Sequence, residues 1–249
     1  MNKINILSSD FRYDALFEIF IEKGYDAHLC TVNTVDECDI LILPIKSALT
    51  DEEFSMIFHK VKKGTLVFSG EVDKIKSHFN GRIINYSKNE DFIDKNAYIT
   101  AECALIIALM DTKKTAFQSS CCIIGYGRIG KHLTDILLRL GANVTVLARR
   151  EESRALAREK GALSYGIEQI SQEKYDIIFN TVPRQIITAD ESKKIFPKAF
   201  VYDLASLPGG FEDESFPKRA LALPGKMMPI SAGKAIFDFV VEYISNERK

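Results

Sequence analysis

The sequence lacks the features that mark membrane proteins and nucleic-acid-binding proteins. Its longest useful apolar run, residues 104–110, is far shorter than the ~20 residues that a membrane-spanning helix needs. No apolar segment of signal-peptide length occurs near its start. Thirty-three basic and 34 acidic residues leave a net charge of −1, so no basic surplus attracts phosphate backbones or anionic lipid. We therefore expect a cytoplasmic protein that binds neither nucleic acid nor membrane.

The sequence also lacks the residue spacings that indicate a disulfide framework or a metal site. Its five cysteines form no CxxC pair and no even set, so we expect reduced thiols in the core. Its four histidines are scattered and show no metal-ligand spacing. We therefore predict no metal site. The residues concerned are Cys30, Cys38, Cys103, Cys121 and Cys122, and His28, His59, His78 and His132.

Strand and helix patterns alternate along the 249 residues, which predicts an α/β protein with parallel sheets. We expect one domain over residues 1–95 and a second over 116–228, with a connecting helix over 96–115. The segment 229–249 reads as a final helix with an apolar stripe that must pack on one of the two domains. A composition of 46% hydrophobic and 27% charged residues argues against disorder.

The strongest motif is a G-x-G-x-x-G that follows an apolar strand and opens an amphipathic helix. In this motif Gly125 permits a tight turn, Gly127 lets a pyrophosphate approach the backbone, and Gly130 allows close packing of helix on strand. Arg128 and Ile129 lie where the helix N-terminus offers amide donors to phosphates. The context predicts a Rossmann dinucleotide-binding domain, against the alternative of a glycine-rich turn with no ligand.

The end of the next strand bears on the choice between the two nicotinamide cofactors. An acidic residue there would bind the ribose 2′-hydroxyl of NAD. Ala148 fills that position, and Arg149 and Arg150 follow. Guanidinium groups bind a 2′-phosphate bidentately, so we expect NADP, with NAD as the alternative cofactor. A second interpretation is that both arginines begin a solvated helix, where Glu151 and Glu152 offset their charge.

Later strands also end in loops that we expect to line the cofactor, because ligands of open α/β sheets lie beyond the carboxyl ends of the strands. Residues 221–226 read as a further loop of this kind. A purely structural turn is the alternative for each loop. The expected cofactor-binding residues in these loops are Asn180, Thr181, Val182, Pro183, Leu204 and Ala205.

Taken in order, several segments resemble the A-type subunit of dipicolinate synthase from spore-forming bacteria. They are SSDFRYDAL, NAYITAECALIIALM, IIGYGRIGKHL, NVTVLARR, NTVPRQII, DLASLPGG and LPGKMMPISAGKAI, and they span nearly the whole chain. The layout is more distantly similar to D-2-hydroxyacid dehydrogenases and S-adenosylhomocysteine hydrolase. That resemblance implies a flavodoxin-like first domain beside the Rossmann domain, with the terminal helix returning to the first domain.

The resemblance also implies a function. It implies oxidation of a dihydrodipicolinate-type precursor to dipicolinate with a nicotinamide cofactor, alongside the flavoprotein-like B-type subunit of dipicolinate synthase, in a heteromer or homo-oligomer. The implied setting is the mother-cell cytoplasm during sporulation. Two alternatives stay open: a non-catalytic nucleotide-binding or scaffold protein of a two-component enzyme, and a divergent dehydrogenase of another small carboxylic acid.

A small dicarboxylate substrate needs cations or amide donors. Arg12 follows the first strand and Lys226 lies in the LPGK segment of the second domain, so we expect both to bind substrate carboxylates across a cleft between the domains. Thr100 and Glu102 open the apolar part of the connecting helix and are further candidates, with capping as the alternative role. No histidine stands out as a general base, and His132 is expected to be structural, so the catalytic residue stays unassigned.

Overall fold

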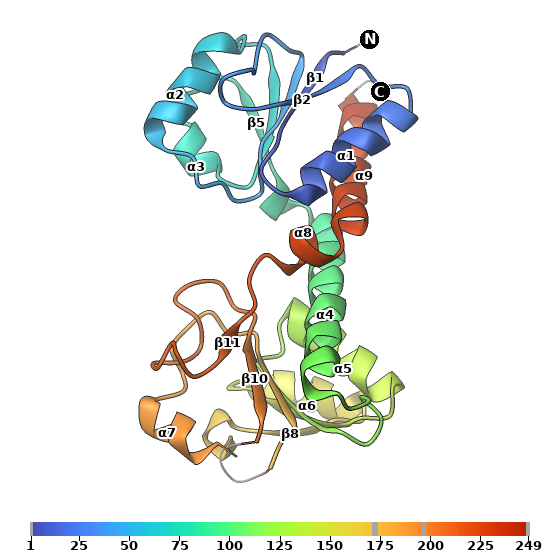
Figure 1. The fold of residues 1–249 in the computed structure, drawn as a ribbon, viewed down its shortest axis with the longest axis vertical. Coiled ribbons are helices and arrows are strands. Elements are labelled where there is room, and N and C mark those ends of the chain that lie inside the picture. The colour runs from blue at the N-terminus through green and yellow to red at the C-terminus, as the bar shows by residue number, and fades with distance from the viewer. Residues whose placement is uncertain (1, 171–173, 196–197, 248–249) are drawn as a thin grey trace. The chain divides into compact units, whose positions relative to one another are not determined.

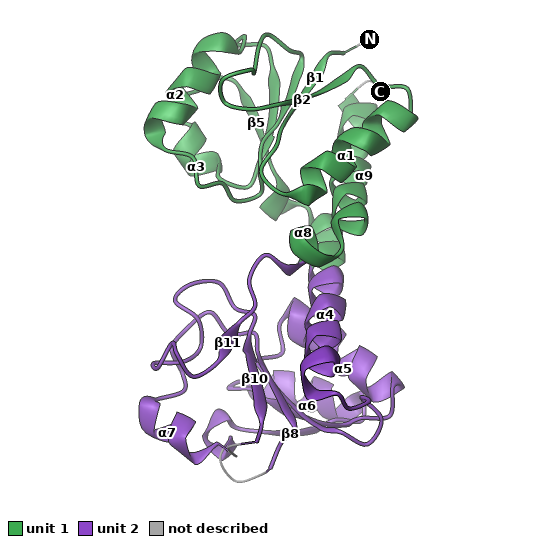
Figure 2. Cartoon of the chain, in the orientation of Figure 1, with its two compact units in different colours: residues 1–96, 224–249 green, residues 97–223 purple. Residues whose placement is uncertain are grey.

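The chain forms two compact units, coloured separately in Figure 2. The computed structural model describes residues 2–170, 174–195 and 198–247. The first unit comprises residues 1–96 and 224–249, and the second comprises residues 97–223. Within the described residues, no helix is both long and apolar enough to cross a membrane.

The first unit is built on a five-stranded parallel sheet with the order β2-β1-β3-β4-β5. This is the strand order of flavodoxin-like doubly wound sheets. Its elements are β1 (Ile4–Leu7), α1 (Phe11–Glu22), β2 (Ala27–Cys30), β3 (Ile40–Ile42), α2 (Asp51–Lys60), β4 (Leu66–Ser69), α3 (Val72–Ile75), β5 (Arg82–Asn85), the 3-10 helix Tyr86–Lys88, the start of α4 (Glu90–Thr112), most of α8 (Leu223–Met227) and α9 (Pro229–Glu247).

Helices cover both faces of this sheet (Figure 1). On one face α9 packs beside α1, where the Phe20 and Phe237 rings meet at 4.8 Å in an edge-to-face contact. On the other face, α2 contributes Phe54, Ile57 and Phe58 to a buried apolar cluster with the sheet. The apolar stripe of the final helix is thus buried within the first unit.

The second unit is built on a six-stranded parallel sheet with the order β11-β10-β9-β6-β7-β8. Counted from its own first strand this is the 3-2-1-4-5-6 order of a Rossmann fold, with the order reversing between β6 and β9. Its elements are the rest of α4, β6 (Ser120–Ile124), α5 (Arg128–Arg139), β7 (Asn143–Leu147), α6 (Glu151–Glu159), β8 (Leu163–Tyr165), the 3-10 helix Ile167–Gln169, β9 (Ile177–Asn180), α7 (Ala189–Lys194), β10 (Phe200–Asp203) and β11 (Lys218–Arg219).

Two segments differ from the sequence expectation. The helix expected over 96–115 begins earlier, at Glu90, because the Asn89 side chain accepts the Phe92 amide at 2.7 Å and so caps a charged first turn. In the segment expected to be a loop over 221–226, the residues from Leu223 onward form the short helix α8, which ends at Met227. Pro224 is compatible with that helix because the first turn of a helix needs no amide donor.

Candidate functional site

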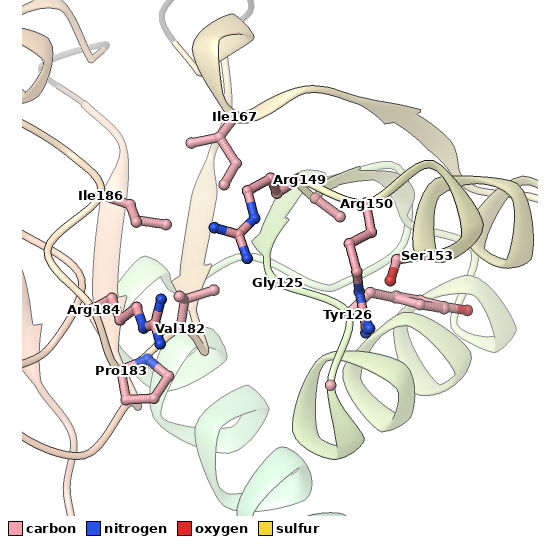
Figure 3. Close-up of a pocket in the computed structure, with 12 residues that line it drawn as sticks. Gly125, Tyr126, Arg149, Arg150, Ser153, Ile167, Val182, Pro183, Arg184 and Ile186 are labelled. Carbon is pink, nitrogen blue, oxygen red and sulfur yellow. The ribbon is translucent and has the colours of Figure 1, made fainter.

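A pocket of about 310 Å³ opens in the second unit at the point where the strand order reverses. The turn after β6 lines it with Gly125, Tyr126 and Gly127, and the segment after β7 lines it with residues 148–150 and Ser153. The loop after β9 contributes residues 182–184 and Ile186, and Ile167 completes the lining (Figure 3). All of these segments follow the carboxyl ends of parallel strands, where ligands of such sheets bind.

The three glycines of the motif have three different geometries. Gly125 has φ +95°, and a Cβ there would lie 2.6 Å from Thr181 Oγ1 and from Val182 Cγ2. A Cβ on Gly130 would overlap the Gly125 carbonyl oxygen, so the helix packs directly against the turn. A Cβ on Gly127 would meet nothing within 4 Å, which leaves this stretch of backbone open to the pocket. These are the separate roles that a dinucleotide turn requires.

The start of α5 faces the ligand position without a side-chain cap. Gly127 is the N-cap residue, and it has no side chain that could cap the helix. Because the first amides of a helix have no intrahelical acceptor, such a start is suited to bind phosphate oxygens. Arg128 and Ile129 lie in this first turn, although their side chains do not line the pocket.

The two arginines that follow β7 are exposed and line the pocket. The neighbouring Glu151 pairs with Arg154 and Arg158 of the same helix, and not with Arg149 or Arg150. In the described parts of the chain neither of these two arginines has an ion pair. The pocket therefore presents unneutralised cations where an NAD-binding sheet would carry a carboxylate.

The loop after β9 is held firmly against the end of β6. The Thr181 amide and hydroxyl both donate to the Ile124 carbonyl at 2.9 Å. The Asn180 side chain accepts the Val182 amide and donates to the Val182 carbonyl, each at 3.1 Å. Of the residues expected from this loop, Val182 and Pro183 line the pocket, while Asn180 and Thr181 position the loop from behind it.

The loop after β10 is organised by the fully buried Asp203. Its carboxylate accepts hydrogen bonds from Asn180 Nδ2 at 2.8 Å, from the amides of Ala205 and Gly210 at 3.1 Å, and from Arg219 Nη1 at 2.8 Å. Leu204 and Ala205, which we expected to touch the cofactor, are buried and do not line the pocket. The Leu204 amide donates to the Asn180 carbonyl at 2.9 Å.

Five lining residues were not among the expected cofactor-binding residues. Arg184 lies inside the NTVPRQII segment, one position beyond the last residue predicted from that loop. Tyr126 lies between two predicted glycines, and burial raises the pKa of its phenol. Ser153, Ile167 and Ile186 come from the first turn of α6, a 3-10 helix and a loop, where no sequence motif indicates a pocket.

The four expected substrate residues fall in different units. Arg12 is 8% exposed, and its Nε donates to both carboxylate oxygens of Asp10, at 2.9 and 3.0 Å. Lys226 was expected in the second domain, but it lies in α8 and belongs to the first unit, as Arg12 does. The physical reason is local packing, since a Cβ on Gly225 would lie 2.6 Å from Arg12 Nη2.

The other two candidates, Thr100 and Glu102, lie in the interior of α4, in the second unit. A capping role for them is therefore wrong, because α4 begins ten residues before Thr100. Thr100 is buried and Glu102 is half-buried.

His132 contacts the Tyr98 ring, with 5.4 Å between the ring centres, and does not line the pocket. No group of histidines, cysteines and carboxylates suited to a metal ion occurs within residues 2–170, 174–195 and 198–247.

Comparison with known proteins places the pocket in a nicotinamide-binding domain. Residues 108–205 match the family model described as D-isomer specific 2-hydroxyacid dehydrogenase, NAD binding domain. Over 275 aligned residues the chain is 24% identical to the A-type subunit of dipicolinate synthase from Bacillus subtilis (strain 168), covering 94% of this chain and 93% of that protein. The resemblance predicted from the sequence is confirmed.

Solved structures show the same fold. The A-type subunit of dipicolinate synthase from Bacillus halodurans superposes with a TM-score of 0.80 at 24% identity, covering 97% of both chains. A transhydrogenase from Sinorhizobium meliloti gives 0.72 at 14% identity, covering 98% of this chain and 94% of its own. The apo-structure of D-lactate dehydrogenase from Escherichia coli gives 0.61 at 12% identity, covering 82% and 74%. The chain thus shares with these proteins a fold of two α/β units, one of them of the Rossmann type.

Proposed function

We propose that this chain is an NADP-linked oxidoreductase that dehydrogenates a dihydrodipicolinate-type precursor to dipicolinate. The observation that carries the proposal is the pocket at the β6/β9 switch point, where an open glycine turn faces arginines that form no ion pair with any described residue. The similarity to the A-type subunit of dipicolinate synthase supports the choice of substrate. The match to an NAD-binding domain supports the choice of cofactor class.

The residues present fit a dinucleotide. The pyrophosphate would lie against the Gly127 backbone and the first turn of α5, where a Cβ would find open space. The adenosine end would lie between the segment after β7 and the loop after β9, against the side chains of Ile167 and Ile186. When bound, the nicotinamide supplies a hydride acceptor. The substrate loses one hydride and one proton, and aromatisation of its ring favours the products.

The selection of NADP follows from charge. Ala148 offers no carboxylate to bind a ribose 2′-hydroxyl, and Arg149 and Arg150 offer guanidinium donors to a 2′-phosphate. Titration calorimetry with both cofactors tests this selection. NADP is expected to bind more tightly, and equal or tighter binding of NAD would show that the two arginines serve another purpose.

The dicarboxylate substrate would be bound through Arg12 and Lys226 of the first unit. A near-neutral chain has no general attraction for a dianion, so local cations must supply it. Thr100 and Glu102 of α4 stay further candidates for substrate contact. Arg12→Ala and Lys226→Ala should each lose dipicolinate binding and keep NADP binding. A variant that binds dipicolinate as tightly as the parent would refute the role of that residue.

A second candidate function is a nucleotide-binding protein that depends on a partner for its chemistry. The observation that favours it is that no histidine lines the pocket among the described residues, so no obvious proton acceptor lies at hand. The partner would be a flavoprotein like the B-type subunit of dipicolinate synthase. This chain would either form a heteromer with that partner or form a homo-oligomer of its own. The setting implied by this assignment is the mother-cell cytoplasm during sporulation. A divergent dehydrogenase of another small carboxylic acid is the remaining alternative.

One experiment separates these candidates. The purified chain is mixed with dihydrodipicolinate and NADP, with and without the flavoprotein partner, and the near-ultraviolet absorbance of the reduced cofactor is followed. Reduction without the partner identifies the chain as the dehydrogenase. Reduction only with the partner identifies the non-catalytic role. No reduction in either mixture, with cofactor binding intact, would move the substrate assignment to another carboxylic acid.

A further inference from the structure

Among the residues that the structure describes, three arginines and no carboxylate line the pocket of the second unit. Two of them, Arg149 and Arg150, follow β7, and the third, Arg184, lies in the loop after β9. All three are exposed, and the described residues provide no ion-pair partner for any of them. Like charges that face one cavity repel each other, so this arrangement is most favourable when an anion of more than one charge is bound there.

Arg184 approaches the pocket from the side opposite to Arg149. β7 and β9 pair with the two edges of β6, so the loops that follow them flank the end of β6 on both sides. In Figure 3 the guanidinium groups of Arg149 and Arg184 are both drawn on the Val182 side of the pocket, whereas Arg150 extends toward Tyr126. The side of the pocket at Val182 therefore offers guanidinium groups from two separate loops.

The backbone around Arg184 is anchored at both ends. Before it, the Val182 amide and carbonyl are bound by the Asn180 side chain at 3.1 Å, and Pro183 restricts its own φ. After it, the amides of Ile186 and Ile187 donate to the Gly210 carbonyl at 2.9 and 3.0 Å. Arg184 thus lies on a short loop with an anchored backbone, so a ligand that binds Arg184 loses little free energy to ordering of the loop.

From this geometry we infer that Arg184 is a specificity-determining residue that binds, together with Arg149, the 2′-phosphate of the adenosine end of the cofactor. A phosphomonoester carries close to two negative charges and three acceptor oxygens, enough for two guanidinium forks at once. The inference rests on the proposed function, because it assigns a further residue to the same cofactor site. It adds the prediction that selection of NADP depends on two loops.

The test uses fragments that differ only in the 2′-phosphate. Adenosine 2′,5′-bisphosphate and adenosine 5′-monophosphate are titrated by calorimetry into the parent chain, Arg184→Gln, Arg184→Lys and the control Arg139→Gln. Arg139 is an exposed arginine of the same unit, in the last turn of α5, outside the pocket. Far-ultraviolet circular dichroism and thermal melting check that each variant is folded.

We expect the parent and Arg139→Gln to prefer the bisphosphate. Arg184→Gln should reduce that preference about tenfold to a hundredfold, which is the loss of one hydrogen bond to a charged group. Binding of the monophosphate should be unchanged. Arg184→Lys should restore part of the preference, since it keeps the charge and loses the planar fork.

The other outcomes separate two kinds of failure. If the parent binds neither nucleotide, the proposed function itself is wrong. If the parent binds both equally, the site does not select a 2′-phosphate, and the inference falls while nucleotide binding stands. If Arg184→Gln keeps the full preference, or loses both nucleotides equally, then Arg184 does not read the 2′-phosphate and the inference is overturned.

Discussion

Two glycines separated by one residue should respond to alanine in opposite ways. Gly127 has φ −80° and ψ −167°, an extended conformation that any residue adopts, and its added Cβ would meet nothing within 4 Å. Gly125 has φ +95°, and its added Cβ would lie 2.6 Å from two side-chain atoms of the loop after β9. Gly127→Ala should therefore disturb the ligand and not the fold, and Gly125→Ala should disturb the fold.

The magnitudes follow from these contacts. For Gly125→Ala, left-handed backbone costs about 1–2 kcal/mol and overpacking about 1–3 kcal/mol, so the free energy of unfolding should fall by about 2–5 kcal/mol. For Gly127→Ala, a compatible backbone gives a stabilisation of about 0.4–1 kcal/mol through the unfolded state. Its methyl group would occupy the closest approach of the pyrophosphate, and loss of a single charged hydrogen bond already weakens binding about tenfold or more.

Thermal melting and calorimetric titration of NADP measure both effects. At about 2–4 °C per kcal/mol, Gly125→Ala should lower the Tm by several degrees, while Gly127→Ala should keep or raise it. Gly127→Ala should nevertheless bind NADP at least tenfold more weakly. If Gly127→Ala were stable and bound the cofactor as the parent does, the turn after β6 would not be the pyrophosphate site, and our assignment of the pocket would be refuted.

Four further predictions concern the same chain. Arg149→Asp should weaken NADP binding by about 1.5–3 kcal/mol and leave NAD binding equal or better in calorimetry; unchanged NADP binding would contradict the charge argument. Asp203→Asn should lower the free energy of urea unfolding by about 3 kcal/mol, since it leaves the partly buried Arg219 without its carboxylate; a neutral substitution would show that the network is dispensable. Burial raises the pKa of all five cysteine thiols, so the native chain should not react with a thiol reagent near neutral pH. In the denatured chain all five thiols should react with the reagent. The pKa of Asp176 is lowered mainly by the hydrogen bond from Lys114 and next by the hydrogen bond from the Ser120 amide. The ionised Asp176 carboxylate therefore stabilises the fold above its unfolded pKa of about 3.9, and this stabilisation is lost as the pH falls through its lower folded pKa. The Tm of the parent and the Tm of Asp176→Asn should therefore converge in acid.

The dinucleotide turn could be predicted from the sequence because its requirements are local. A tight turn, an open backbone and a close helix contact each demand glycine at a set spacing, and Gly125, Gly127 and Gly130 meet these demands in the structure. The arginines after β7 were predictable for the same reason, since their place depends only on the end of one strand. Alternation of strands and helices likewise predicts two parallel α/β sheets, which the structure contains.

What the sequence by itself determined, then, is the glycine turn, the arginines after β7 and the alternation of strands and helices, whose causes lie within a few residues along the chain. Tertiary structure alone decided which strand-end loops meet. Arg184 lines the pocket because β9 pairs with β6, whereas Leu204 is buried and does not line it. Lys226 joins the unit of Arg12 because α8 packs on that side chain. Such outcomes depend on hydrogen bonds and packing between segments far apart in sequence, and no local spacing encodes those contacts.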